Sequence, residues 1–275
     1  MEGKTWVKWT VTFEPSRDQE LILSWLSDLS PRGLWEIDEQ TVVAYFDEAP
    51  RKTQLPDGVI SLKKEIELDR CWAETWRSFF RPIRLGRRIV VRPPWEKSVP
   101  DTVDVVIYPA YAFGTGDHPT TALCLTHLER YLRPGLDVLD IGSGSGILAI
   151  LAAKLQAGKI VTLDNDRLAI TEIRRNMALN ELGKERIEYR LTELADLTGS
   201  FDLIVANIGL KYHLDQLPAM FERLRDGGRL ILSGFEVEDT ARLAEKARTI
   251  GLTEEARQIA TGWSSLVYNK KGSGS

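Results

Sequence analysis

Two glycine-rich stretches hold most of the side chains in this sequence that could do chemistry. The first, AFGTGDHPTT (residues 112–121), places His118 among two glycines and three hydroxyls, and the second, VLDIGSGSGILAI (138–150), begins seventeen residues further on. The first stretch is not a phosphate-binding P-loop, because it lacks the GK[ST] signature of that loop. The chain has three histidines (118, 127 and 213), and His118 has no ligating partners nearby, so we expect no metal site.

The sequence around His118 also predicts the start of a helix. Pro119 suits the first helical turn, and Thr120 or Thr121 is a typical capping side chain. A capped helix N-terminus beside a glycine loop can also hold the carboxylate of a ligand. His118 is then either a hydrogen-bonded structural residue or part of the lining of an acceptor site.

Gly142, Gly144 and Gly146 form a GxGxG turn between a strand-like stretch and a helical one. Glycine permits a tight turn and lets a ligand approach the backbone closely. Asp164 closes the next strand-like stretch, 22 residues after Gly142, where a carboxylate can accept both hydroxyls of an adenosine ribose. A glycine turn alone is common, so it is this context that indicates a nucleoside-binding site.

Asp140, just ahead of the turn, separates the two cofactors that such a site could bind. NAD would place the negative charges of its pyrophosphate against the turn, where a buried carboxylate repels them. S-adenosylmethionine has no phosphate and carries a sulfonium and an ammonium, both positive. The GxGxG spacing, in place of GxGxxG, also favours the methyl donor. The residues therefore favour a methyltransferase, with a NAD-dependent oxidoreductase as the alternative.

The elements that must position these residues predict an α/β fold. From about residue 101, apolar strand-like stretches alternate with helical ones, and the strand-like stretches are DVLDIG, KIVTLDND, RIEYRL, FDLIVANI, RLILSGF and SSLVYNK. This alternation is typical of a parallel sheet with helices on both faces. Ligands of such sheets bind beyond the carboxyl ends of the strands.

The first part of the chain predicts a separate small α+β domain. KTWVKWTVTF alternates like a strand, RDQELILSWLSDL is amphipathic like a helix, and GLWEID, TVVAYFD and VISLKKEIEL are strand-like. This order suggests a ferredoxin-like arrangement. CWAETWRSFFRP has Trp72, Trp76 and Phe80 at helical spacing, packing against a neighbouring domain. We therefore expect a small domain at 1–62, a helical connector at 63–100, a second domain at 101–271 and a cloning remnant at 272–275.

Composition is that of a globular protein, with 43% hydrophobic and 28% charged residues. No apolar run is long enough to span a membrane, and the N-terminus lacks the apolar block of a signal peptide. Cys71 and Cys124 lie outside any CxxC spacing, so we expect inert thiols and a cytoplasmic location.

Charge is distributed unevenly along the chain. Residues 1–70 carry nine Lys and Arg against fourteen Asp and Glu, whereas residues 71–100 carry seven against two. The acidic part disfavours nucleic acid and favours a basic partner. The arginines at 77, 81, 84, 87, 88 and 92 form a solvated face or structural ion pairs, or else they contact RNA.

The two glycine-rich stretches, together with FDLIVANI, GGRLILSGF and WAETWRSFFRPIRLGRRIVVRPPW, resemble the PrmA family, the bacterial lysine methyltransferases of large-subunit ribosomal protein eleven. The resemblance runs from about residue 66 onward, and the acidic first domain fits the family's small substrate-recognition domain. It implies a seven-stranded Rossmann-like methyltransferase domain and S-adenosylmethionine as cofactor. It also implies methylation of lysine and N-terminal amino groups of a basic ribosomal protein, by a monomer without stable nucleic-acid binding.

The resemblance also assigns roles to single residues. By motif, Thr121, Gly142, Asp164 and Asn207 correspond to the family's cofactor contacts, and Gly144 belongs to the same glycine turn. Asn207 ends the strand-like FDLIVAN, where it either positions the acceptor amine or only caps the strand.

This chain departs from the family's pattern at three places. Tyr108-Pro109-Ala110 stands where Asp-Pro-Gly is common, Gly209 follows Asn207-Ile208 where the family has Leu, and Arg167 stands where Pro is usual. Tyr108 and Gly209 bear on the acceptor pocket. A methyltransferase acting on another protein or a small molecule is therefore the second interpretation. A non-enzymatic binding protein is a third.

Overall fold

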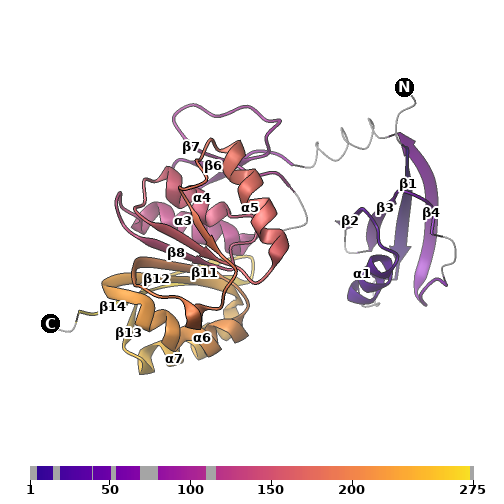
Figure 1. The fold of residues 1–275 in the computed structure, drawn as a ribbon. Coiled ribbons are helices and arrows are strands. Elements are labelled where there is room, and N and C mark those ends of the chain that lie inside the picture. The colour runs from indigo at the N-terminus through magenta and orange to yellow at the C-terminus, as the bar shows by residue number, and fades with distance from the viewer. Residues whose placement is uncertain are drawn as a thin grey trace. The chain divides into compact units, whose positions relative to one another are not determined.

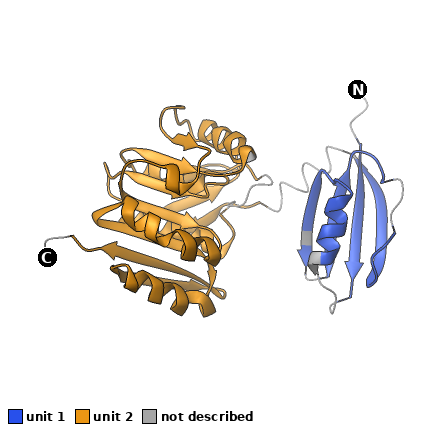
Figure 2. Ribbon diagram, turned by 60° about the horizontal axis from the view of Figure 1, so that its bottom comes forward, with its two compact units in different colours: residues 1–79 blue, residues 80–275 orange. Residues whose placement is uncertain are grey.

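The computed structural model describes residues 5–14, 19–38, 40–50, 54–68, 80–109 and 116–272. The chain divides into two compact units, residues 1–79 and 80–275 (Figure 2). Most of the predicted helix at 71–82 lies outside the described residues.

The N-terminal unit is a four-stranded antiparallel sheet in the order β2-β3-β1-β4 (Figure 1). Its elements are β1 (Thr5–Phe13), α1 (Gln19–Asp28), β2 (Gly33–Asp38), β3 (Thr41–Phe46) and β4 (Val59–Leu68). The described residues between β3 and β4 contain no helix. The predicted strands and the first helix are confirmed. The predicted domain boundary at residue 62 is wrong, because it cuts β4, which pairs with β1 over its whole length.

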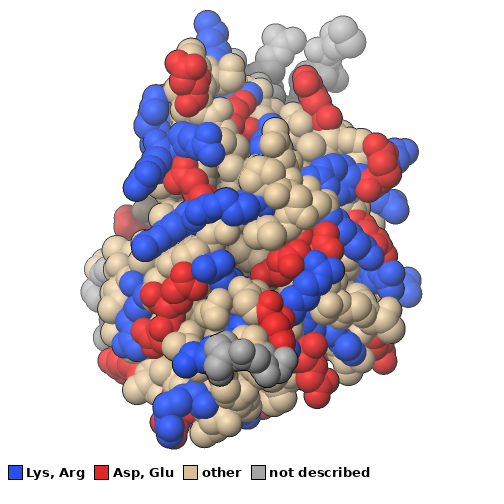
Figure 3. Space-filling view, turned by 90° about the vertical axis from the view of Figure 1, so that its left-hand side faces the viewer, with Lys and Arg blue, Asp and Glu red and all other residues tan. Residues whose placement is uncertain are grey.

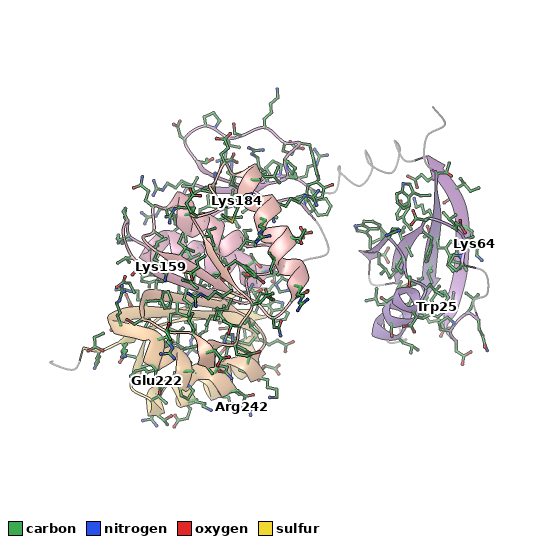
Figure 4. All side chains as sticks on the ribbon, in the orientation of Figure 1. Trp25, Lys64, Lys159, Lys184, Glu222 and Arg242 are labelled. Atoms are coloured by element: carbon green, nitrogen blue, oxygen red, sulfur yellow. The ribbon has the colours of Figure 1, made fainter. Side chains whose placement is uncertain are left out.

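The alternation of β1 explains how this sheet holds α1. Trp9, Val11 and Phe13 point to one face and are fully buried with residues of α1. Trp9 packs against Trp25 of α1, with ring centroids 6.4 Å apart. The ammonium of Lys64 on β4 lies 4.2 Å from the centroid of the Trp9 ring (Figure 4). Aromatic packing under one helix thus holds a unit too small for a large aliphatic core.

Residues 83–92 are not part of a helical connector, contrary to the prediction for 63–100. They form β5 (Ile83–Leu85) and β6 (Ile89–Arg92), which join β7 (Val103–Val106) in a three-stranded sheet of the second unit. Ile89, Val90 and Val91 are all buried, and such a β-branched run favours a strand over a helix. The sequence analysis included this run in the connector because the aromatic residues at 71–82 have helical spacing.

The second unit contains a seven-stranded sheet among its described residues, in the order β10-β9-β8-β11-β12-β14-β13. Its strands are β8 (Val138–Ile141), β9 (Ile160–Leu163), β10 (Glu188–Arg190), β11 (Phe201–Asn207), β12 (Leu224–Glu236), β13 (Leu252–Ala260) and β14 (Trp263–Lys270). The first five are parallel, whereas β14 is antiparallel to both β12 and β13. The parallel sheet that the alternation predicted therefore holds for β8 to β12, and the sheet is antiparallel at β14 and β13. The sequence analysis also missed β13.

Helices cover both faces of this sheet, as predicted (Figure 1). They are α3 (Pro119–Tyr131), α4 (Ile147–Lys154) and α5 (Arg167–Leu179) on one face, with α6 (Leu210–Arg223) and α7 (Thr240–Thr249) on the other. All residues of β8 and β9 are buried. Consequently polar side chains on β8 and β9 can be reached only from the carboxyl ends of these strands, where the loops leave the sheet.

Candidate active site

The glycine turn joins β8 to α4 with a backbone that only glycine adopts readily. Gly142, Gly144 and Gly146 have φ angles of 74°, 48° and 79°. A Cβ on Gly142 would lie 2.7 Å from Ile208 Cδ1, and one on Gly146 would lie 2.4 Å from Ile173 Cγ1. The turn therefore presents bare backbone at the carboxyl end of β8.

Asp164 lies directly after β9 and holds the glycine turn. Its Oδ2 accepts a hydrogen bond from the backbone N–H of Gly144 (2.8 Å), and its Oδ1 accepts one from Asp166 N–H (2.9 Å). The structure thus brings together two residues that the sequence assigned to one site. Carboxylate oxygens accept more than one hydrogen bond, so Asp164 keeps capacity for hydroxyl groups.

Asn207 and Thr121 also meet, although they are 86 positions apart in the chain. Asn207 Nδ2 donates to Thr121 Oγ1 at 3.2 Å, and Thr121 is fully buried. Asn207 Oδ1 is buried and has no hydrogen-bond partner among the described residues. A buried amide oxygen without a partner costs free energy, so a ligand that donates a hydrogen bond there gains affinity.

Asp140 on β8 is fully buried, and neither of its carboxylate oxygens has a hydrogen-bond partner in the described part of the chain. Burial raises the pKa of Asp140 to about 7; the backbone N–H of Ala149, which faces the carboxylate without forming a hydrogen bond of normal geometry, opposes this rise, and the charge of Asp164 adds to it. Ser143 Oγ and Thr162 Oγ1 are also buried without partners there. The Asp140 carboxylate fits a cationic, hydrogen-bonding ligand and repels an anionic one, whereas the two hydroxyls can each donate or accept a hydrogen bond.

His118 is the N-cap of α3, and the predicted caps Thr120 and Thr121 are wrong. Its Nδ1 accepts a hydrogen bond from the backbone N–H of Thr120 (3.3 Å) and lies 2.7 Å from the Thr120 hydroxyl. Pro119 occupies the first helical position, as predicted. The acceptor role of Nδ1 toward the Thr120 N–H leaves Nε2 as the nitrogen that can donate a hydrogen bond.

Trp263 is a neighbour of His118 that the sequence analysis missed. The two rings form an edge-to-face pair with centroids 4.9 Å apart. Trp263 begins β14, directly after the left-handed Gly262. The only sequence signal was a large aromatic side chain next to a turn. The Trp263 ring therefore lies beside the N-terminus of α3.

The family model described as "Ribosomal protein L11 methyltransferase (PrmA)" matches residues 6–271. The chain belongs to this family. A ribosomal protein L11 methyltransferase of Desulforapulum autotrophicum is 37% identical over 254 residues, which cover 91% of this chain and 80% of that protein. One of Geobacter metallireducens is 40% identical over 227 residues, 82% of this chain and 72% of that protein.

Solved structures agree with the family. The crystal structure of a ribosomal protein L11 methylase from Lactobacillus delbrueckii subsp. bulgaricus has a TM-score of 0.65 and 33% identity, covering 70% of this chain and all of that one. A methyltransferase from Pyrococcus furiosus, at 20% identity and a TM-score of 0.50 over 61% of this chain and 90% of that one, shows the same fold. The second unit therefore has the mixed α/β fold of the class I methyltransferases.

The structure describes the neighbours of two residues that depart from the PrmA pattern, Tyr108 and Gly209. The Tyr108 ring packs against Arg175 of α5, whose guanidinium carbon lies 3.2 Å from the ring centroid, and meets Trp95 edge-on at 6.0 Å. A Cβ on Gly209 would meet nothing within 4 Å. Gly209 directly precedes α6 and follows Asn207-Ile208, so the missing side chain leaves open space close to Asn207.

The remaining candidates lie outside this site. His127 and His213 are buried, and burial lowers the pKa of each to about 4, so both are neutral core residues. Cys124 is buried, and burial raises the pKa of its thiol. Cys71, Trp72, Trp76 and Arg77 lie outside the described residues.

The basic run contributes ion pairs where the structure describes it. Arg92 binds both carboxylate oxygens of Asp104 (2.7 and 2.6 Å), and Arg88 pairs with Glu129 at 3.8 Å. On the face of the molecule in Figure 3, Lys and Arg are interspersed with Asp and Glu among the described residues. No described helix is long and apolar enough to cross a membrane.

Proposed function

We propose that this protein transfers methyl groups from S-adenosylmethionine to amino groups of ribosomal protein L11, at lysine side chains and at the N-terminus. Family membership supports the reaction and the substrate. The single structural observation that supports the cofactor is the set of buried, unpartnered acceptors around the glycine turn, led by Asp140. A cationic ligand relieves that cost, whereas a pyrophosphate increases it.

In this proposal, each residue around the turn binds a different part of the cofactor. Asp164 accepts the ribose hydroxyls, and the bare backbone at Gly142 and Gly144 allows close approach. Asp140 provides the negative charge for the cationic end, and Thr121 with Asn207 closes the site on the side of β11. S-adenosylmethionine supplies an electrophilic methyl group on a good leaving group, so the protein needs mainly to position the acceptor.

The acceptor amine must arrive deprotonated, with its lone pair directed at the methyl carbon. Asn207 Oδ1 can accept one amine hydrogen and thereby orient the lone pair. The rings of His118 and Trp263 limit the path by which the amine approaches. As the new N–C bond forms and the S–C bond breaks, the nitrogen becomes cationic and releases a proton to water. Removal from water lowers the pKa of a lysine ammonium, so the site favours the neutral amine without a dedicated base.

The N-terminal unit is the substrate-recognition module in this proposal. Its strand order, β2-β3-β1-β4, with α1 following β1, supports a reduced ferredoxin-like fold. Residues 1–70 carry fourteen acidic and nine basic residues, and this excess of negative charge attracts a basic ribosomal protein.

A methyl-transfer assay on purified L11 and on a whole lysate tests the function. Radiolabel from S-adenosylmethionine should appear in L11 and in its lysine and N-terminal residues. If a different protein or a small molecule were labelled and L11 were not, that molecule would be the substrate in place of L11. Tight NAD binding with no affinity for S-adenosylmethionine would overturn the whole assignment.

A further inference from the structure

Helix α5 carries two buried asparagines one turn apart, Asn176 and Asn180. They are 0% and 7% exposed, so every polar atom of their amides needs a partner within the protein. Both side chains reach backbone groups far away in the sequence. Their partners differ, and this difference assigns them different roles.

Asn176 links two segments that flank the candidate active site. Its Nδ2 donates to the carbonyl oxygen of Ser145 inside the glycine turn (2.8 Å), and its Oδ1 accepts from the backbone N–H of Tyr108 (2.9 Å). Tyr108 lies shortly after β7 and only four positions before the stretch 112–121. One side chain therefore sets the separation between the glycine turn and the segment that leads toward that stretch.

Away from its own helix, the Asn180 side chain makes hydrogen bonds to the end of β7. Its Oδ1 accepts from Val106 N–H (2.9 Å), and its Nδ2 donates to Val106 O (2.6 Å) and to Asn176 O (2.7 Å). Its side chain makes three hydrogen bonds, one more than that of Asn176, and none of the three is to the glycine turn. Asn180 is therefore a matched control for Asn176 on the same helix.

The side chains of Asp164 and Asn176 both form hydrogen bonds with the backbone of the glycine turn. Asp164 accepts from the N–H of Gly144, and Asn176 donates to the carbonyl of the next residue, Ser145. These two bonds fix the peptide groups on either side of the Gly144–Ser145 pair, in a turn whose glycines sample many conformations when unrestrained. A loop already held in its binding conformation does not lose that freedom when a ligand arrives, which raises affinity.

We propose that Asn176 is a positioning residue for the cofactor, acting through Ser145 on the glycine turn and through Tyr108 on the segment after β7. The inference rests on the proposed use of S-adenosylmethionine. Asn176 does not touch the cofactor. It keeps the turn in register with Asp164, so its loss weakens cofactor binding more than it weakens the fold.

Substitution by aspartate tests the link to Ser145. Asn176→Asp keeps the acceptor for Tyr108 N–H but faces the Ser145 carbonyl with an oxygen that cannot donate. Calorimetry with S-adenosylhomocysteine should show a Kd at least about tenfold higher than that of the full-length wild-type protein, the scale of one buried hydrogen bond lost. Asn180→Asp should change the Kd less than about threefold. Its melting temperature without cofactor should nevertheless fall about as much as that of Asn176→Asp.

A pH series separates positioning from a general loss of structure. A protonated carboxyl can donate again, and burial raises the pKa of a carboxyl introduced at this position. The ratio of the Asn176→Asp Kd to the wild-type Kd should therefore fall toward one as the pH is lowered. The corresponding ratio for Asn180→Asp should stay flat.

The outcomes distinguish this proposal from the proposed function. If wild-type protein does not bind S-adenosylhomocysteine, the proposed function fails. If wild type binds and Asn176→Asp binds equally well, only the positioning role is wrong. If Asn176→Asp does not fold, Asn176→Ala replaces it, since it lacks the donor without opposing two acceptors. Failure of both to fold, while Asn180→Asp folds, would leave Asn176 a purely structural residue and overturn the proposal.

Discussion

Asp140 should make cofactor binding depend on pH, because it is a buried carboxyl that a cationic ligand would stabilise in its ionised form. Burial raises its pKa from 3.8 to about 7 in the folded protein. At pH 7 about half of the molecules carry the proton, and binding of a cation should release it. The affinity for S-adenosylmethionine should therefore rise by up to about tenfold per pH unit below 7 and level off above it.

The same shift has a consequence for the cofactor-free protein. A carboxyl whose pKa is higher in the folded than in the unfolded chain stabilises the fold below the unfolded value and loses that contribution as the pH rises to the folded value. For Asp140 the window runs from 3.8 to about 7. A shift of this size corresponds to about 4 kcal/mol of unfolding free energy as an upper scale.

Asp140→Asn removes this titration and keeps the shape of the side chain. Relative to wild type, the variant should gain stability progressively between pH 4 and pH 7 in urea unfolding without cofactor, and its cofactor affinity should be lower at pH 8. The ammonium of the ligand titrates equally with both proteins, so the difference between their Kd profiles isolates Asp140. Parallel pH profiles for the two proteins, in both assays, would refute the assignment of a cation to this carboxyl.

Three further predictions concern the cofactor, the acceptor and the substrate. Asp164→Ala should weaken S-adenosylhomocysteine binding by about 1–3 kcal/mol in calorimetry, the scale of a lost charge-assisted hydrogen bond, and normal binding would remove Asp164 from the site. Asn207→Ala should lower kcat on L11 more than it raises the Kd for the cofactor, because in the proposed function Oδ1 accepts a hydrogen bond from the amine; full turnover would make Asn207 a strand-end cap. Neutralising three exposed carboxylates of the N-terminal unit should raise the KM for L11 at low salt and leave cofactor affinity unchanged, with the triple variant being Glu14→Gln, Asp28→Asn and Glu48→Gln. The matched control neutralises three exposed carboxylates of the second unit, namely Glu185→Gln, Glu222→Gln and Glu238→Gln. An equal effect of both triple variants would show that recognition does not reside in the N-terminal charge.

Strong periodicity made most elements predictable. β1 and β3 bury alternate or successive apolar residues, and α4 and α6 have continuous helical patterns, so local sequence and tertiary burial agree. β13 was missed because its sequence, LTEEARQIA, carries charges at the edge of the sheet, where only one neighbour, β14, supplies hydrogen bonds. Charged side chains protect such an edge and also hide it from hydropathy patterns.

The site itself was only partly predictable. Sequence spacing indicated Asp164 and the glycine turn, and the structure joins them through Gly144 N–H. The cap at His118 was mistaken, because Thr is the commoner cap and the competition between neighbouring side chains depends on the path of the chain before α3. Trp263 could not be paired with His118 from sequence, since their contact requires β14 to enter the sheet antiparallel to β12.

The strand order explains why these particular residues meet. From β8 the chain runs outward through β9 to the edge strand β10, then returns to β11 on the other side of β8. In open α/β sheets the loops at such a reversal of strand order lead toward opposite faces, and ligands bind beyond the carboxyl ends of the two strands, here β8 and β11. Asp140 and the glycine turn come from one of them, and Asn207 comes from the other. Asp140 and Asn207, which both have buried oxygens without partners among the described residues, thus come from the two strands at which the strand order reverses, and this coincidence is the physical basis of the proposed cofactor site.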